Sequence, residues 1–334
     1  MITLGIETSC DDTSAAVVDN GVVRSNIISS QTIHNTYGGI VPELASREHI
    51  KGIGPIVQAA LAEARCEMQD IDAIAVTYGP GLAGSLLVGT HFAKGLALAH
   101  GKPLYPIHHI EAHLYSGYLE QPDLVFPSVS LVVSGGHTSI FFIEDVVTYK
   151  VLGSTCDDAA GEAFDKVSKM LGLGYPGGPE IDARAAHGDA DAFDFPRGLM
   201  HDGTYDFSFS GLKTSVRRML EVLKSKDADV PVNDVCASVQ EAIVDVLVEK
   251  TLRAALEYHV SAITISGGVS ANSRLRARMR ERAESCGIAV IAPRIGYCVD
   301  NAAMIAHIAE LRMRHGVEPS SAAFTISPKA LRTV

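Results

Sequence analysis

The sequence predicts an α/β protein with two similarly ordered lobes, and three observations support this fold class. The chain has 334 residues, 47% apolar and 20% charged, a balance typical of a globular protein long enough for two domains. Its opening segment reads as three strands followed by a helix. From residue 127 the same order returns without the same sequence. Two such lobes, each with a hairpin that turns through small residues, imply a cleft between them.

Each element of the first half has a local signal. An apolar run at residues 2–8 indicates a buried strand, and alternating residues on both sides of Asn20-Gly21 indicate a hairpin. Pro42 in a first turn and Gly101 after a last turn mark one helix start and one helix end. The other expected elements are helices at 42–64 and 85–101, strands at 72–81 and 103–107, and a short helix containing "HHIEAH".

The second half repeats this order. A Gly-Gly turn joins two strands in "PSVSLVVSGGHTSIFFIED", and a third strand and a helix follow. A long apolar pattern then leads to the strand "AITISGG" and a further helix, and a last helical pattern follows Asp300. The expected ranges are strands within 127–155, helices at 157–174 and 234–259, and a strand at 262–268.

Composition excludes several classes of protein. The formal net charge of −11 argues against a protein that coats nucleic acid unaided. One local exception is the series Arg274, Arg276, Arg278, Arg280 and Arg282, which fits either a solvated helix or an edge that contacts phosphates. No apolar run is long enough to span a bilayer, and the start does not resemble a signal peptide, so we expect a cytoplasmic protein with reduced cysteines.

Two histidines four residues apart are the first candidate site. On a helix, His109 and His113 share one face and can converge on one metal ion, although paired histidines near a helix start also serve as capping or packing residues. Glu111 lies between them, at the wrong offset for the H-E-x-x-H pattern of zinc proteases. A third ligand is needed to decide between a metal site and a capping or packing role.

Asp300 is a candidate third ligand. It directly precedes a helical pattern, so its default role is to cap that helix. Yet a carboxylate there, near the end of the second lobe, is also well placed to fold back across the cleft. Two histidines and one aspartate form the open facial triad typical of ferrous iron, with zinc as the alternative.

Turns after strands indicate a second, anion-binding or nucleotide-binding site. "VVSGGHT" (132–138) and "ITISGGVSAN" (263–272) both end a strand with Ser-Gly-Gly, which lets backbone N–H groups approach a ligand. We expect these turns at matching positions of the two lobes, with the glycine cluster "GYPGGPEID" as a third such turn. Asn272 would then contact a base or sugar from the other lobe.

Acidic residues surround these turns. Glu7, Asp11 and Asp12 follow the first strand, where carboxylates can orient water, a metal ion or a substrate amine. Asp158, Glu162 and Asp165 are spaced to share one helix face, a repulsive arrangement usually tolerated only when a group is bound or the face is well solvated. Asp165 and Asp182 are therefore candidates for contacts with ribose hydroxyls.

Several motifs together carry a family resemblance. They are "GIETSCDDTSAAVV", "GPGLAGSLLVG", "HHIEAH", "VVSGGHTS", "DDAAGEAFDKVSKMLGLGYPGGP", "FSFSGLKTS", "ISGGVSANSRLR" and "YCVDNAAMIA". From residue 2 to about 328 the chain resembles the universal tRNA threonylcarbamoyladenosine transferase (TsaD) family, in its bacterial branch. The resemblance implies the two-lobed actin-like ATPase fold of sugar kinases and Hsp70, and we expect residues 1–120 with 300–334 to form one lobe and 121–299 the other.

The resemblance also implies site residues. His109, His113 and Asp300 would hold iron or zinc, and Asp11 would assist the transfer, with Glu7 as a second catalytic candidate. The implied contacts to an adenylate, or to ATP or ADP in the same cleft, are Val132, Val133, Ser134, Gly135, Gly136, His137, Asp165, Gly178, Asp182 and Asn272.

The implied reaction moves a threonylcarbamoyl group from threonylcarbamoyl-AMP to N6 of adenosine 37 in tRNAs that read codons starting with A. The implied partners are tRNA, an inactive actin-like paralogue of the TsaB type and a small P-loop ATPase of the TsaE type. Two alternatives from other classes stay open. One is a metallo-endopeptidase, and the other is a kinase or non-catalytic ATP-dependent scaffold on the same fold.

Overall fold

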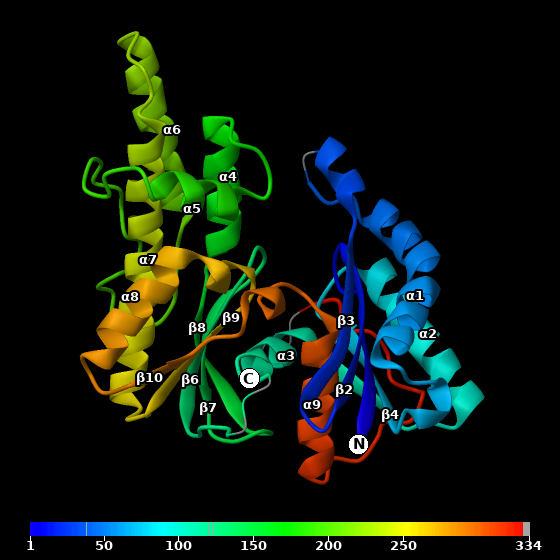
Figure 1. The fold of residues 1–334 in the computed structure, drawn as a ribbon. Helices are drawn as coiled ribbons and strands as arrows, with labels where there is room; N and C mark the ends of the chain where they lie inside the picture. Colours follow the sequence, from blue (N-terminus) through cyan, green and yellow to red (C-terminus); the bar gives the residue numbers. More distant parts are fainter. Residues whose placement is uncertain (38, 120, 122, 330–334) are drawn as a thin grey trace. The chain divides into compact units, whose positions relative to one another are not determined.

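The computed structural model describes residues 1–37, 39–119, 121 and 123–329, and the chain divides into two compact units. The first unit is Met1–Leu124 with Pro293–Val334, and the second is Val125–Ala292. Each unit is a five-stranded mixed sheet with helices packed on it (Figure 1). The first unit is therefore discontinuous in sequence, and its last helix follows the whole of the second unit.

The sheet of the first unit has the order β3-β2-β1-β4-β5. Strand β1 pairs antiparallel with β2 and parallel with β4, so the antiparallel and parallel parts of the sheet meet at β1. The β2–β3 hairpin turns through Asn20 and Gly21 with φ of 50° and 84°, which confirms the predicted turn. The strands are β1 (Ile2–Glu7), β2 (Asp12–Asp19), β3 (Val22–Ser30), β4 (Ala73–Gly79) and β5 (Leu104–His108).

Helices cover both faces of this sheet. Alternation along β1 sends Leu4 and Ile6 into the core formed with α1 and α2, and Gly5 to the opposite face under α9. A Cβ on Gly5 would lie 2.2 Å from the carbonyl oxygen of Ala302, so only glycine lets α9 approach this closely. The helices are η1 (Thr32–Tyr37), α1 (Pro42–Ala64), η2 (Met68–Asp70), α2 (Ala83–His100), α3 (His109–Ser116), η4 (Ile295–Tyr297) and α9 (Ala302–Arg314).

The second unit repeats the topology of the first. Its sheet has the order β10-β9-β6-β7-β8, again with two antiparallel pairings on one side of the first strand and two parallel pairings on the other. This confirms the prediction of two similarly ordered α/β lobes. The strands are β6 (Ser128–Val133), β7 (Thr138–Ile143), β8 (Tyr149–Ser154), β9 (Ala262–Ser266) and β10 (Ala289–Ile291).

Five α-helices and one short 3-10 helix complete the described part of the second unit. Helix α7 is buried along most of its length, packs on β6 and β9 and lies beside α5 and α8. The helices are α4 (Ala160–Leu171), α5 (Gly177–Ala185), α6 (Ser210–Ser225), α7 (Val232–Glu257), η3 (Gly268–Ala271) and α8 (Ser273–Glu284).

Three differences from the predicted elements concern the second unit. Helix α4 begins at Ala160 rather than near residue 157, and the cluster "GYPGGPEID" contains the start of helix α5 rather than only a turn. Helix α6 and strand β10 have no counterpart among the expected elements. Among the described residues, no helix is both long and apolar enough to cross a bilayer, and all six cysteines are free thiols.

Candidate functional site

His109, His113 and Asp300 come together in the first unit, with one ligand atom from each lying within 4.8 Å of the others. Nε2 of His113 lies 3.1 Å and Nε2 of His109 lies 3.4 Å from the same Asp300 oxygen. Both histidines are buried, and their rings meet edge to face with centroids 4.7 Å apart. Two imidazoles and a carboxylate, all aimed at one point, are a donor set that fits Fe²⁺ or Zn²⁺.

The parallel strands of the first unit position this cluster. His109 directly follows β5, and His113 lies one turn later on α3, so the i, i+4 spacing places both rings on one face as predicted. Asp300 lies just before α9. The helix cap itself is Asn301, whose side-chain oxygen accepts a hydrogen bond from the N–H of Met304 at 3.1 Å. The default capping role predicted for Asp300 is therefore wrong, and its carboxylate is free to face the histidines.

Glu7 lies behind His109. It ends β1, is completely buried, and its Oε2 lies 3.0 Å from Nδ1 of His109. The same carboxylate accepts hydrogen bonds from the hydroxyl of Thr77 at 2.6 Å and from the N–H of Ser9. A carboxylate behind a ligating histidine fixes the ring and places its proton on Nδ1, which leaves Nε2 for the metal. The sequence predicts Glu7 as a catalytic candidate, and its place behind His109 fits the role of a positioning residue.

The charges of His109, Asp300 and Glu7 stabilise one another. Burial opposes protonation of His109, but the negative charges of Asp300 and Glu7 outweigh burial and raise its pKa well above the usual value. Burial likewise opposes ionisation of Asp300, yet His109 holds the pKa of this carboxyl well below its usual range. The protein thus stabilises one positive charge between two carboxylates. A divalent cation carries that charge without a proton, which is a second reason why the residues fit a metal.

Glu111 points away from this cluster. It is 2% exposed, and both carboxylate oxygens accept hydrogen bonds from the guanidinium of Arg312, at 2.6 and 3.0 Å. The carboxylate is therefore engaged in a bidentate ion pair between α3 and α9. This geometry disfavours the peptidase alternative, which needs a glutamate beside the metal as general base.

Asp11 and Asp12 lie in the turn after Glu7 and at the start of β2, and both are partly exposed. Burial, together with the nearby negative charges of Asp11, Asp300 and Glu7, raises the pKa of Asp12 to about 6, against a hydrogen bond from Ser30 that lowers it. Burial first, and then Asp11, raises the pKa of the Cys10 thiol, which therefore stays protonated. This turn supplies carboxylates rather than a thiolate nucleophile.

Both Ser-Gly-Gly turns belong to the second unit. One follows β6 and the other follows β9, and these strands are parallel neighbours, so the two turns lie at the same edge of one sheet. Gly267 has φ of 85°, and a Cβ there would lie 2.5 Å from the carbonyl oxygen of Val133. The expectation of one such turn in each lobe is therefore wrong. Their common edge is the carboxyl end of parallel strands, where open α/β sheets bind ligands.

The residues expected to contact a nucleotide gather around this edge. The Ser134–His137 turn is closed by a hydrogen bond from the N–H of Ser134 to the carbonyl of His137 at 2.7 Å. A Cβ on Gly135, Gly136 or Gly178 would meet no other atom within 4 Å, and none of these glycines has a positive φ. Packing and backbone conformation within the described protein thus give no reason for glycine at these positions. A ligand lying close against the backbone supplies one.

The polar side chains at this edge already have protein partners. The carboxylate of Asp165 accepts a hydrogen bond from the N–H of Gly177 at 2.7 Å, and Asp182 accepts from both the N–H and the hydroxyl of Ser273. Asn272 caps α8 and donates its amide to Gln240 at 2.7 Å. Asn272 lies in the same unit as Asp165, so its predicted place in the other lobe is wrong. Both ends of its amide are engaged, as are both oxygens of Asp182.

Two charge patterns differ from their predicted roles. Asp158 precedes α4, and Lys166 lies 2.7 Å from Asp158 and 2.8 Å from Glu162, so these carboxylates need no bound group to offset their repulsion. On α8, Arg274 forms a bidentate pair with Glu241 of α7 at 2.6 and 2.7 Å. Arg278 and Arg282 also pair with carboxylates of α7. Much of this arginine series therefore stabilises helix packing.

Comparisons with known proteins agree with the resemblance in the sequence. The sequence model of the TsaD family, described as tRNA N6-adenosine threonylcarbamoyltransferase, matches residues 22–307. A protein of that name from Chlorobium phaeobacteroides (strain BS1) is 53% identical over 94% of this chain and 94% of its own length. Another, from Moorella thermoacetica (strain ATCC 39073 / JCM 9320), is 52% identical over 90% of this chain and 89% of its own.

Solved structures show the fold. Full-length HypF in a phosphate- and nucleotide-bound form has a TM-score of 0.62 and 14% identity, covering 95% of this chain and 47% of HypF. Component A of (R)-2-hydroxyglutaryl-CoA dehydratase from Acidaminococcus fermentans has a TM-score of 0.56 and 14% identity, covering 92% of this chain and 96% of component A. These proteins have the actin-like ATPase fold, which confirms the predicted fold class. With half of its residues shared with the curated relatives along nearly its whole length, the chain belongs to the TsaD family of tRNA N6-adenosine threonylcarbamoyltransferases.

Proposed function

We propose that this chain transfers the L-threonylcarbamoyl group of threonylcarbamoyl-AMP to N6 of adenosine 37, in tRNAs that read codons starting with A, and releases AMP. Family membership supports the transfer to a tRNA adenosine. The observation that carries the proposal is the convergence of His109, His113 and Asp300 on one point, backed by the buried Glu7. A kinase on this fold has no need of such a cluster.

The proposed cofactor is one divalent cation, Fe²⁺ in preference to Zn²⁺. His109, His113 and Asp300 would hold it, and three protein ligands leave coordination positions open for a substrate oxygen. When bound, the cation supplies positive charge that anchors and polarises the threonylcarbamoyl group. Glu7 keeps the Nδ1 proton of His109 in place, so that Nε2 remains a ligand.

The proposed adenylate site lies at the carboxyl end of β6 and β9. Backbone N–H groups of Ser134–His137 would hold the phosphate, because this turn is partly exposed and its two glycines leave room for a close approach. Val132 and Val133 end the strand that presents the turn. Asp165 and Gly178 would contact the nucleoside, and ATP or ADP would compete for the same site. Asp182 and Asn272 would support this edge through their hydrogen bonds to α8 and α7.

In the proposed transfer, N6 of the adenine attacks the carbamoyl carbon. The new N–C bond replaces the bond from that carbon to the phosphate oxygen, and AMP leaves with the bonding electrons. Asp11 is the proposed acceptor of the N6 proton, because the exocyclic amine is a weak nucleophile and gains from a nearby base. Asp12, whose pKa is about 6, lies next to it and maintains negative charge at the turn. Holding both reactants together supplies much of the remaining rate.

The proposed partners are tRNA, an inactive actin-like paralogue of the TsaB type and a P-loop ATPase of the TsaE type, all in the cytoplasm. The acidic balance of this chain supports shared RNA binding, since a net charge of −11 opposes an unaided polyanion complex.

Reconstitution with threonylcarbamoyl-AMP and an unmodified tRNA, followed by nucleoside analysis, tests the proposal. The expected product is threonylcarbamoyladenosine at one position of the anticodon loop. The H109A/H113A double variant should lose both bound metal and transfer, whereas Glu43→Gln, an exposed change on α1, should retain both. Full transfer by a metal-free double variant would refute the role of the cluster. Incubation of metal-loaded protein with an unfolded protein decides the peptidase alternative.

A further inference from the structure

Helix α6 carries a stripe of basic side chains that the proposed site does not use. The helix contains four basic residues and one acidic residue, although the chain as a whole is strongly acidic. At 3.6 residues per turn, Lys213, Arg217 and Lys224 lie within about 40° of one another around the helix and span about 16 Å along it. These three residues are called the α6 stripe below.

The other side of α6 is fixed in the core of the second unit. Leu212 and Val216 are 3% and 0% exposed, so the orientation of the helix about its own axis is set by packing. Its first turn is held by Asp157, which accepts hydrogen bonds from the N–H of Phe209 at 2.8 Å and the hydroxyl of Ser210 at 2.7 Å. Figure 1 shows α6 beside α4, the helix that carries Asp165. The stripe is thus presented by an anchored helix.

The charges of the α6 stripe face solvent. Within the described part of the chain, the single ion pair of the stripe joins Arg217 to Glu221 at 3.8 Å, and these side chains are 67% and 71% exposed. A pair so exposed contributes little and leaves the arginine available. Lys224 is exposed and Lys213 is partly exposed.

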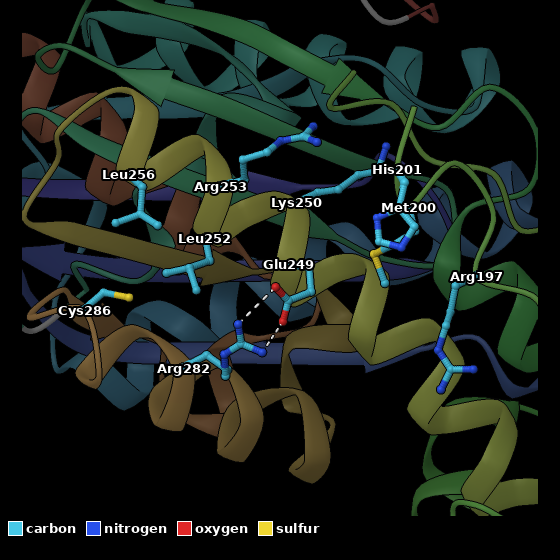
Figure 2. Close-up of a pocket in the computed structure, with 10 residues that line it drawn as sticks. All are labelled: Arg197, Met200, His201, Glu249, Lys250, Leu252, Arg253, Leu256, Arg282 and Cys286. Atoms are coloured by element: carbon cyan, nitrogen blue, oxygen red, sulfur yellow. Dashed lines mark hydrogen bonds and ion pairs between the residues drawn. The ribbon is translucent and has the colours of Figure 1, made fainter. Parts of the chain in front are cut away.

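Other basic clusters of this unit are already neutralised. In the groove shown in Figure 2, of about 600 Å³, Arg282 points at Glu249 and forms an ion pair with it. Arg197 pairs with Asp245 at 2.9 Å, and the buried Lys250 pairs with Asp202 at 2.9 Å. On α8, Arg274, Arg278 and Arg282 pair with carboxylates of α7 in the same way. By comparison, the three cations of the α6 stripe have one acidic partner between them among the described residues, the exposed Glu221.

From this contrast we infer that the α6 stripe binds the phosphate backbone of the tRNA substrate. The inference rests on the proposed function, which supplies a polyanion as substrate. An acidic chain repels RNA at long range, so association requires a local basic surface whose cations outnumber their acidic partners and face solvent. The stripe meets both requirements, and its position beside α4 brings RNA bound there near the proposed adenylate site. Phosphate contacts orient the RNA, while the choice of base belongs to the active site.

The test measures the affinity of an unmodified tRNA transcript for the full chain as a function of salt concentration. The R217Q/K224Q variant should bind at least tenfold more weakly at low salt, and the slope of log K against log salt should become shallower by about 1.5, since each lost phosphate contact removes about 0.7–0.9. Glutamine favours helix, so the fold is retained. The matched control is R47Q/K51Q on α1, which makes the same charge change at side chains 65% and 69% exposed and should leave the slope unchanged.

Two results would overturn the inference. One is an R217Q/K224Q variant whose salt slope equals that of the unaltered protein, which would assign the stripe to an acidic protein partner instead. The other is an unaltered chain whose RNA affinity does not depend on salt. Failure of the proposed function is distinguishable, because the H109A/H113A variant should bind tRNA with an unchanged slope. If the unaltered chain shows no transfer but its salt slope still falls in the R217Q/K224Q variant, the proposed transfer is rejected and the inference about the α6 stripe stands.

Discussion

Replacing Glu7 by glutamine is expected to weaken metal binding although residue 7 is not a ligand. The carboxylate accepts three hydrogen bonds, from His109, Thr77 and Ser9. Glutamine offers one oxygen and one NH₂ group. If its oxygen faces His109 and Thr77, the NH₂ group opposes the N–H of Ser9. If the NH₂ group faces His109, Nδ1 must accept, the ring proton moves to Nε2, and that nitrogen no longer binds a metal.

The expected loss of metal affinity can be taken from other metal sites in which a carboxylate supports a ligating histidine. Loss of such a partner lowers metal affinity roughly 10- to 100-fold, which is about 1.4–2.8 kcal/mol. The hydrogen-bond mismatch in a fully buried site also destabilises the metal-free protein, by about 1–3 kcal/mol. Thr77→Val is the matched control, because it removes one donor to Glu7 and keeps both the carboxylate and its bond to His109. We expect it to change metal affinity less than tenfold, the lower limit for losing the supporting carboxylate itself.

Two measurements separate metal binding from folding. Chelator competition gives the metal dissociation constant of each variant, and thermal unfolding with and without metal gives the stabilisation that binding adds. A purely structural role would lower the melting temperature of metal-free E7Q while leaving the metal-induced rise intact. A folded E7Q protein with the metal affinity of the unaltered chain would refute the assignment of Glu7 as a positioning residue.

Three further predictions concern other parts of the molecule. Gly135→Val and Gly178→Val should each weaken binding of adenine nucleotides by roughly tenfold, about 1.4 kcal/mol, in calorimetric titrations; their melting temperatures should not change, since a Cβ there meets open space, and unaltered affinity would contradict the proposed adenylate site. Burial, aided by the charge of Arg314, lowers the pKa of His307 to about 4 from its usual 6.5, so this residue contributes stability that is present above pH 6.5 and lost as the pH falls toward 4. The loss of stability should reach about 3 kcal/mol at pH 4. In His307→Phe, the free energy of unfolding measured with denaturant should therefore depend less on pH between pH 7 and 4. Arg312→Met should destabilise the protein by about 3–5 kcal/mol because it leaves Glu111 buried and unpaired, and adding Glu111→Leu should restore most of the loss; a stable single variant would show that the pair is not needed.

The sequence predicts the elements whose signals are local. Helix α1 begins at Pro42, α2 ends before Gly101 in the left-handed conformation, and Asn20-Gly21 forms its turn, because each of these residues constrains its own backbone. Helix α6 is absent from the expected elements although Leu212, Val216, Met219 and Leu220 give it an apolar face at helical spacing. That periodicity was available and would have identified the helix.

The site residues also divide into those set by local spacing and those set by long-range packing. The i, i+4 spacing of His109 and His113 is a local property, so a shared face could be predicted. The partners of Asp300, Asp182 and Asn272 could not, since each depends on which distant elements pack together. In particular, the parallel pairing of β6 with β9 places both Ser-Gly-Gly turns in one unit, a fact of topology rather than of composition. The pairing of α8 arginines with the acids of α7 depends on helix packing in the same way, whereas the pair of Lys166 with Glu162 is a local i, i+4 contact that the sequence does indicate.

His113 and Asp300 are 187 positions apart in the chain, with the whole second unit inserted between them. A cation held by both would close that long loop like a clasp, and the closure entropy of a loop grows with its length. The ion would therefore hold α9 against the face of the sheet where Gly5 lies, and the ligand set is complete only after the whole second unit has been synthesised. Metal occupancy would then report that α9, which follows the whole second unit in the chain, has packed on the sheet of the first unit.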